Sequence, residues 1–351
     1  MLRKILLSTI AICCLYGCIK DAPLNPEADI ETFTIDRSQL TSDVFIDQVN
    51  RKVMLYLKPD AFDKGVAPVL TLSAGASVTP ASGDSIFFDN GNVPEYTVTS
   101  ASGENKKTYL VEVVAIGEWK WAFEKWEIND KDKYQYLVEN DGNLVWSSGN
   151  PGVALSGVPK NPEGYPLRAT TDKYEGTYAA ELLTMPGTAL SNLVGIKLFA
   201  GSLFLGNFDS QSAFLEPLKA TQFGQPYQGR PRSFTGWYKY APGASYQDKA
   251  GNIIPGMHDS CAIYAVLYSG TTRLDATNIH TSDRIIATAK LPDGSGRGNF
   301  TRFDIPFTFL PGKIPRGDMM MAIVASSSKD GDTYRGAIGS RLVLDSLEIT
   351  Q

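Results

Sequence analysis

Alternating hydrophobic and polar positions recur in short stretches through the first third of the chain. Val53, Leu55 and Leu57 are apolar at every second position, and residues 109–113 repeat the spacing. A period of two places such side chains on one face of a β-strand. Clusters of Gly, Ser and Asn separate the stretches, and no helical periodicity intervenes. We therefore expect about seven short strands, which fit an immunoglobulin-like β-sandwich over residues 29–116.

The pattern changes after residue 116. All five tryptophans lie beyond it, and the alternating stretches become longer, with wider, glycine-rich loops between them. The candidate strands are residues 121–126, 178–183, 233–240, 261–268, 283–289, 300–307, 319–325 and 342–349. Roughly ten strands with long loops are typical of two packed antiparallel sheets. An all-β chain is expected, in which a larger jelly roll at residues 117–351 follows the first sandwich.

The N-terminus has the pattern of an export signal. Arg3 and Lys4 precede an apolar run over residues 5–14. About 20 apolar residues are needed to span a bilayer, so this shorter run predicts a cleaved signal peptide at residues 1–17.

The residues around Cys18 resemble a bacterial lipobox. Gly17 is small, as the cleavage point requires, while Tyr16 is larger than is usual there. The resemblance implies a lipid on Cys18, with an ordinary signal cut elsewhere as the alternative. Residues 18–28 are polar and contain prolines, which predicts a tether. Lys20-Asp21 resembles part of a Bacteroidetes surface-export signal, so we expect an outer-membrane lipoprotein, at the cell surface rather than on the periplasmic face.

Charge limits the partners. Loss of Arg3 and Lys4 with the signal takes the formal net charge from −5 to −7. An acidic chain without a basic cluster is poorly suited to nucleic acid. We therefore expect contact with a membrane only through the lipid anchor.

Cysteine and histidine are too sparse for several kinds of site. Cys13 and Cys14 leave with the signal, which strands Cys261 as a buried, inert thiol without an intrachain disulfide. His258 and His280 have no zinc-binding spacing. The segment that starts Asp-Lys-Asp at residue 130 lacks the glycine of a calcium loop. No cofactor is expected.

Six segments resemble the putative carbohydrate metabolism domain of Bacteroidetes. They are FEKW at 123–126, WSSGNPG at 146–152, GSLFLGNF at 201–208, FTGWYKYAPG at 234–243, SSSKDG at 326–331 and GSRLVLD at 339–345. The resemblance implies a jelly roll similar to carbohydrate-binding modules and jelly-roll glycoside hydrolases, without an established reaction. Residues 72–83, 96–99 and 109–113 resemble the small immunoglobulin-like domains that begin Bacteroidetes surface lipoproteins, which implies a spacer.

A sugar site needs an aromatic plane for the C–H face of the ring and polar groups for its hydroxyls. The strand period puts Trp237 and Lys239 on one face and Tyr240 on the other. The alternative is that Trp237 is core and Lys239 extends to the edge. Trp146 and Asn150 lie in a second candidate segment, whose alternative is a turn that caps its own backbone. We take these five residues as the candidate substrate contacts.

Glycoside hydrolysis requires only two carboxylates about 5–10 Å apart. Glu181, Asp259 and Asp304 are candidates, with a solvated outer face as the alternative for each. Glu124 and Asp345, on the presumed first and last strands, suggest a structural calcium, although surface salt bridges are favoured.

Three hypotheses follow for the function. The favoured one is a glycan-binding lipoprotein that captures a poly- or oligosaccharide, because aromatic and amide groups are plentiful. A glycoside hydrolase with an unrecognised carboxylate pair is the runner-up. A structural or adhesive surface protein is the third.

Overall fold

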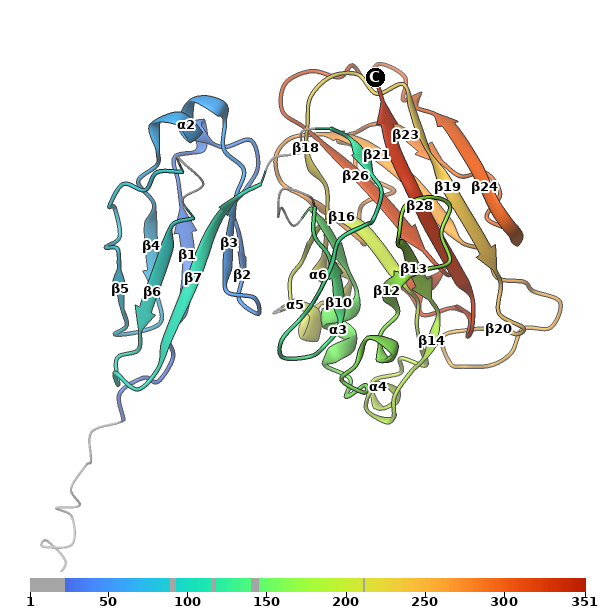
Figure 1. Ribbon diagram of the computed structural model, residues 1–351, viewed down its shortest axis with the longest axis horizontal. Coiled ribbons are helices and arrows are strands. Elements are labelled where there is room, and N and C mark those ends of the chain that lie inside the picture. The colour runs from blue at the N-terminus through green and yellow to red at the C-terminus, as the bar shows by residue number, and fades with distance from the viewer. Residues whose placement is uncertain (1–22, 89–92, 115–117, 140–144, 211) are drawn as a thin grey trace, which may run out of the picture.

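The structure, a computed structural model, describes residues 23–88, 93–114, 118–139, 145–210 and 212–351. Figure 1 shows two domains side by side, both built mainly from strands. The all-β fold class is thereby confirmed. No helix within these ranges is long and apolar enough to cross a membrane. The predicted signal peptide, Cys18 and the predicted boundary at residues 116–117 lie outside the described residues.

Seven strands make up the described part of the N-terminal domain: β1 (Ile30–Thr34), β2 (Phe45–Asp47), β3 (Lys52–Leu55), β4 (Val69–Leu72), β5 (Ser77–Thr79), β6 (Glu95–Thr99) and β7 (Lys106–Val113). One sheet has the order β2-β3-β7-β6-β5, and β1 pairs with β4. The expectation of no helical segment is wrong, because η1 (Arg37–Gln39) and α2 (Pro59–Lys64) are helical. Both are too short to show a helical period, and α2 begins with the proline that favours a first turn.

Strand β3 is buried on both faces. Val53 and Leu55 point into the core of the N-terminal domain, as the alternation predicts. Met54 and Tyr56 belong instead to the core cluster of the second domain. The N-terminal sandwich therefore uses one strand to fill its own interior and to bind its neighbour.

Nine strands form the larger sheet of the second domain, in the order β22-β17-β16-β26-β21-β23-β25, with β11 beside β16 and β18 beside β26. Their bounds are β11 (Trp146–Ser148), β16 (Ser202–Phe208), β17 (Thr221–Phe223), β18 (Gln225–Tyr227), β21 (Ala262–Ser269), β22 (Leu274–Asp275), β23 (Ile285–Lys290), β25 (Thr308–Phe309) and β26 (Met319–Ser326).

Six strands form the smaller sheet, in the order β12-β13-β28-β19-β24, with β8 beside β28. Their bounds are β8 (Lys120–Trp121), β12 (Leu167–Thr170), β13 (Ala179–Leu183), β19 (Ser233–Ala241), β24 (Arg297–Pro306) and β28 (Arg341–Thr350). The remaining elements are β9 (Trp126–Ile128), β10 (Gln135–Leu137), β14 (Met185–Pro186), β15 (Leu198–Phe199), β20 (Tyr246–Gln247), β27 (Gly336–Ala337), α3 (Asn150–Ala154), η3 (Pro162–Gly164), α4 (Ala189–Leu193), α5 (Ser212–Leu215), α6 (Pro217–Ala220) and η4 (Gly331–Thr333).

The two faces of the nine-stranded sheet are both apolar. On β26, Met321 and Ile323 pack between the sheets with Leu342 and Leu344 of β28. The alternate residues of β26, such as Met320, belong to a separate apolar cluster on the outer face. The uninterrupted apolar sequence of β26 follows from this double burial. The outer face therefore offers an apolar floor, which the smaller sheet does not.

Tyr56 joins the two domains. Its ring is fully buried, and Cζ of Arg273 lies 4.6 Å from the ring centroid. Its hydroxyl accepts a 3.3 Å hydrogen bond from Nδ2 of Asn207. A second link is the 2.9 Å bond from Nδ2 of Asn129 to Oδ1 of Asn50. Because the interface is both apolar and hydrogen-bonded, we expect the domains to unfold together.

Replacing Tyr56 with Ala tests this coupling. Loss of a buried ring should lower the free energy of unfolding by about 3–5 kcal/mol, and at this position the loss should weaken the contact between the domains. Differential scanning calorimetry should show two transitions where the unchanged chain shows one. Val53→Ala is the matched control, because it weakens the N-terminal core alone and should keep a single transition at lower temperature. One transition in Tyr56→Ala would contradict the coupling.

Candidate functional site

The outer face of the nine-stranded sheet is hollowed into a cleft of about 270 Å³. Phe204, Val324 and Tyr264 lie opposite one another on β16, β26 and β21 and form an apolar row across its floor. Ser202 pairs with Ser326 two positions along, which adds a polar row beside the first. Alternation along a strand brings both rows to the same face. The floor thus combines an apolar surface with hydroxyl groups.

The walls of the cleft carry aromatic side chains from four separate places in the chain, namely Phe199, Phe208, His280 and Tyr334. The centroid of the His280 ring lies 5.0 Å from that of Tyr264. Burial lowers the pKa of His280, and the charge of Lys290 lowers it further, so the imidazole is neutral at pH 7. Burial raises the pKa of Tyr334, which keeps its phenol protonated. The walls therefore offer uncharged hydrogen-bonding groups.

Asp259, a predicted catalytic candidate, anchors one wall of the cleft instead of facing it. Its Oδ2 accepts hydrogen bonds from Oγ of Ser328 (2.6 Å), Oγ of Ser340 (2.7 Å) and N of Ala337 (2.8 Å). Its Oδ1 accepts one from N of Ser260 (2.9 Å). The carboxylate is buried and fully engaged, so it cannot reach a ligand. Its role is to hold the segment that carries η4 and Tyr334.

Three predicted substrate contacts lie in the interior. Trp146 is buried edge-to-face against Trp121, 5.2 Å between ring centroids. The buried amide of Asn150 bonds both N and O of Leu167, at 3.1 and 2.8 Å. The hydroxyl of the buried Tyr240 donates to the backbone carbonyl of Ser327, at 3.0 Å. Their expected exposure is wrong, because the segments that contain them pack inward.

Trp237 and Lys239 share the outer face of the six-stranded sheet, as the strand period predicts. Tyr174 stacks on Trp237, with ring centroids 3.7 Å apart and planes 12° from parallel. Nζ of Lys239 lies 2.9 Å from both carboxylate oxygens of Asp172. The lysine is therefore paired, and the aromatic plane that remains open to a ligand is the outer face of Tyr174.

Glu181, the other catalytic candidate, belongs to a chain of ion pairs on the same face. Its carboxylate contacts Arg168 at 2.6 Å and Arg341 at 2.5 Å. Arg341 also binds Asp172, at 2.7 Å, and Asp172 leads on to Lys239. Burial alone would raise the pKa of Asp172, but Arg341 and Lys239 outweigh it and hold the pKa below its ordinary value. Asp304 is exposed, and its Oδ2 lies 3.3 Å from Nη2 of Arg302. It is therefore a solvated outer-face residue, the alternative that was given for it above.

Glu124 and Asp345 position the loop that carries Tyr174. Oε2 of Glu124 accepts a 2.8 Å bond from N of Thr177, and Oδ2 of Asp345 accepts bonds from N of Tyr174 (2.8 Å) and N of Glu175 (3.2 Å). The favoured surface salt bridges are wrong, since backbone amides occupy both carboxylates. Burial raises the pKa of Asp345, partly offset by these amides. No cluster of three or more potential metal-ligating side chains occurs in the described ranges.

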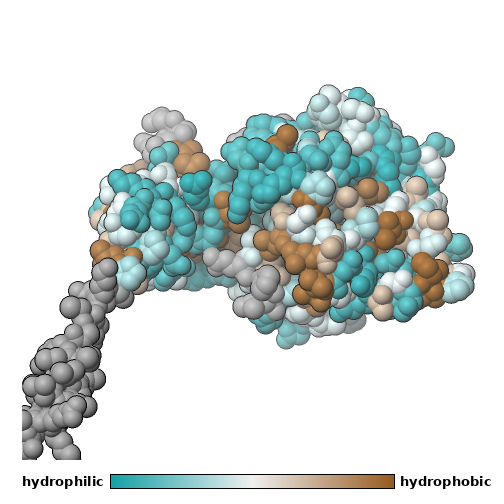
Figure 2. Space-filling model, turned by 90° about the horizontal axis from the view of Figure 1, so that it is seen from below, coloured by the Kyte–Doolittle hydropathy of each residue, from teal (hydrophilic) through white to brown (hydrophobic). Residues whose placement is uncertain are grey.

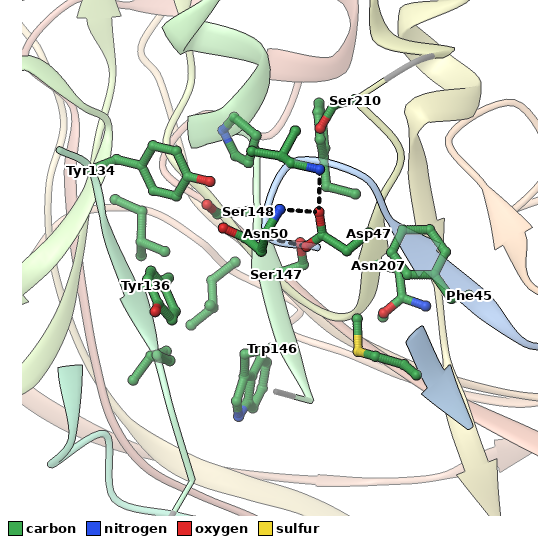
Figure 3. Close-up of a pocket in the computed structure, with 18 residues that line it drawn as sticks. Phe45, Asp47, Asn50, Tyr134, Tyr136, Trp146, Ser147, Ser148, Asn207 and Ser210 are labelled. Carbon is green, nitrogen blue, oxygen red and sulfur yellow. Dashed lines mark hydrogen bonds between the residues drawn. The ribbon is translucent and has the colours of Figure 1, made fainter. Parts of the chain in front are cut away.

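A smaller cavity of about 60 Å³ lies where the two domains meet (Figure 3). Asp47 and Asn50 of the N-terminal domain face Trp146 and Asn207 across it. Oδ1 of Asp47 accepts hydrogen bonds from the backbone amides of Val49 and Asn50, both at 3.0 Å, so the carboxylate stabilises the turn that follows it. This volume exceeds the ~10–15 Å³ that a single water molecule needs, so the cavity can hold ordered water. We assign it to the domain contact.

The sequence reasoning missed the residues that shape the cleft. Tyr264 lies in the candidate strand at residues 261–268, for which the sequence predicts no ligand contact, and His280 enters the sequence analysis only as a possible zinc ligand. The segments that resemble the carbohydrate metabolism family could have pointed to the cleft. Residues 201–208 supply part of its floor and residues 326–331 part of its rim. Residues 146–152 contribute as well, through Gly149 and Gly152 rather than through Trp146.

Comparisons with known proteins agree with this architecture. The family model described as "Putative carbohydrate metabolism domain" matches residues 122–350, and "SGBP, N-terminal" matches residues 30–113. No curated protein matches the chain.

Two solved structures are similar over long stretches. A putative glycoside hydrolase from Bacteroides thetaiotaomicron VPI-5482 is 34% identical with a TM-score of 0.84, covering 94% of this chain and 98% of its own. A putative glycoside hydrolase from Bacteroides vulgatus ATCC 8482 is 31% identical with a TM-score of 0.60, covering 66% of this chain and 98% of its own. The chain therefore belongs to the putative carbohydrate metabolism domain family.

Proposed function

We propose that the chain binds a poly- or oligosaccharide in the cleft on the nine-stranded sheet. The observation that carries the proposal is a concave site in which the accessible rings of Phe199, Phe208, His280 and Tyr334 border a floor with an accessible hydroxyl row, Ser202 and Ser326. An aromatic ring accommodates the C–H face of a sugar, while the neighbouring hydroxyls reach its edge. Membership in a carbohydrate-related family supports the same class of ligand.

The floor serines retain hydrogen-bonding capacity for a ligand. Oγ of Ser202 accepts from N of Gly149 at 3.0 Å, which leaves its proton free to donate. Oγ of Ser326 donates to the carbonyl of Ser328 at 2.7 Å and accepts from N of Ser328 at 3.4 Å, which leaves one lone pair able to accept from a ligand. One serine can therefore act as donor and the other as acceptor, as the hydroxyls of a sugar require. At the rim, Lys329 pairs with Asp330 at 2.6 Å, and Asp332 adds a further carboxylate.

Tyr334→Ala and His280→Ala should each weaken glycan binding at least tenfold, about 1.4 kcal/mol, because each removes a wall of the cleft. Affinity electrophoresis against a panel of neutral and acidic polysaccharides measures the loss, and calorimetry on the best ligand quantifies it. Tyr174→Ala is the matched control, because it removes an exposed tyrosine that packs on the six-stranded sheet, away from the cleft.

The control also locates the site. Loss of binding in Tyr174→Ala alone would move the site to Trp237 and Lys239 on the six-stranded sheet. Failure of the unchanged chain to bind any glycan would reject the proposal in favour of the structural or adhesive alternative.

Glycoside hydrolysis is the second candidate, because both similar structures carry that name. Glu181 and Asp172 contact the same Arg341 and are therefore neighbours. Hydrolysis needs one carboxyl group that keeps its proton near neutral pH, whereas both of these bind guanidinium groups. Binding without cleavage is accordingly favoured.

Glu181→Gln separates the two functions. Breaking a buried ion pair should lower the free energy of unfolding by about 3 kcal/mol, measured by urea denaturation, while glycan retention persists. The exposed Glu104→Gln, which should change neither quantity, is the control. Release of reducing sugar by the unchanged chain, lost in Glu181→Gln, would establish an enzyme.

We further propose that the chain is an outer-membrane lipoprotein at the cell surface, acylated on Cys18 and exported through Lys20-Asp21. Cys18→Ser should abolish incorporation of labelled palmitate, while Cys14→Ser, a neighbouring thiol within the signal, should leave it intact. Digestion of the protein by protease added to intact cells tests its surface position. Palmitate retained in Cys18→Ser would mean that lipid is attached elsewhere.

A further inference from the structure

One end of the jelly roll exposes large hydrophobic side chains. Leu193 is 82% exposed and Val194 72%, with Leu190 and Leu155 also more than half exposed. Scattered apolar residues are normal on a protein surface, whereas a contiguous group marks a contact with a partner or a membrane. We call these four residues the base patch.

The base patch is held in a defined conformation. Leu190 and Leu193 belong to α4, whose first turn is closed by reciprocal bonds between Thr188 and Ser191. Oγ1 of Thr188 also donates to the carbonyl of Ser156, at 2.7 Å, which places Leu155 beside α4. Within the turn, N of Asn192 donates to the carbonyl of Thr188, and N of Val194 and N of Ile196 donate to the carbonyl of Ser191. The base patch can therefore enter an apolar medium without leaving those backbone groups unpaired.

A second exposed group continues the base patch. Ile253, Ile254 and Met257 are exposed in the loop after β20, and Gly251 of that loop lies against Lys197, just beyond α4. Figure 2, which views this end of the molecule, shows hydrophobic residues gathered on the underside of the larger domain between polar regions. Lys197 therefore lies between the base patch and this second group.

The position of the patch relative to the predicted anchor points to its occupant. In Figure 1, α4 and the start of the described chain both lie on the lower side of the molecule, each at the bottom of a different domain. Four residues lie between Cys18 and Pro23, and the five Cα-to-Cα steps reach at most about 18 Å. A bilayer that holds the lipid of Cys18 must therefore lie close to the start of the described chain, on that lower side.

We infer that the base patch inserts into the bilayer that holds the lipid anchor, so that the jelly roll rests on the membrane surface. The inference rests on the proposed acylation of Cys18. An apolar tip flanked by a lysine is the composition of an interfacial membrane contact. Ile196 and Phe199, which follow α4, line the cleft, so the contact would set the cleft beside the membrane.

Site-specific fluorescence on the full lipidated chain tests the inference. Leu193→Cys and Val194→Cys can be labelled selectively with an environment-sensitive dye, because Cys261 is buried and burial raises its thiol pKa to about 12. The chain is reconstituted into vesicles of phosphatidylethanolamine and phosphatidylglycerol. Both labels should shift to shorter emission wavelength and be quenched by nitroxide-bearing lipid.

Ile314→Cys is the matched control, since Ile314 is 65% exposed in the loop before β26. The other end of β26, at Ser326, is the one that pairs with Ser202, shortly after α4. The label at Ile314 should stay in water. Leu193→Asp combined with Val194→Asp should remove the quenching of a label at Ile253→Cys, and these exposed substitutions leave the core untouched. Persistent quenching there would overturn the inference.

Three other outcomes would also overturn it. Chains that float with the vesicles are anchored. If the label at Leu193 in such chains stays in water like the label at Ile314, the base patch does not insert into the bilayer. Chains that do not float would reject the acylation itself. An emission shift without vesicles that grows with protein concentration would assign the patch to a second copy of the chain.

Discussion

The buried carboxylate of Asp259 is the contact on which the cleft depends. Four donors surround it, from Ser260, Ser328, Ala337 and Ser340. A buried charge without such partners is very costly, so the surrounding segment is held in the one arrangement that supplies them. The wall that carries η4 lies within that segment. Because the network is closed, its polar groups stabilise the wall and leave the aromatic side chains to face the cleft.

The two sheets of the jelly roll differ in what covers their outer faces. Strand β26 is apolar on both sides, so the larger sheet presents an apolar floor that aromatic side chains can border. The smaller sheet has a polar outer face, on which Glu181, Arg341 and Asp172 neutralise one another in a chain of ion pairs. Mutual pairing makes that face a rigid surface rather than a source of free acid or base. A binding function on the larger sheet and a structural role for the ion pairs follow from this division.

The arrangement of the domains argues against the expected role of the N-terminal sandwich as a simple spacer. Tyr56 is part of the larger domain's core, so the two domains lie side by side in firm contact. A spacer placed beneath the jelly roll would instead need few contacts with it. Because the start of the described chain and α4 lie on the same side of the molecule, under different domains, the proposed anchor and the base patch suit a molecule that lies along a membrane.

The sequence by itself determined the all-β class, the two kinds of sandwich and the family, because strand periodicity and local motifs are properties of neighbouring residues. It also placed Trp237 and Lys239 on one face, since side chains alternate along a strand. Tertiary structure decided which faces are covered. Trp146, Asn150 and Tyr240 have the composition of a sugar site, yet they are buried by segments remote in sequence. Tyr264 and His280 meet at the cleft only because a strand and a distant loop pack together, and burial is set by such packing rather than by the residues beside each position in the chain.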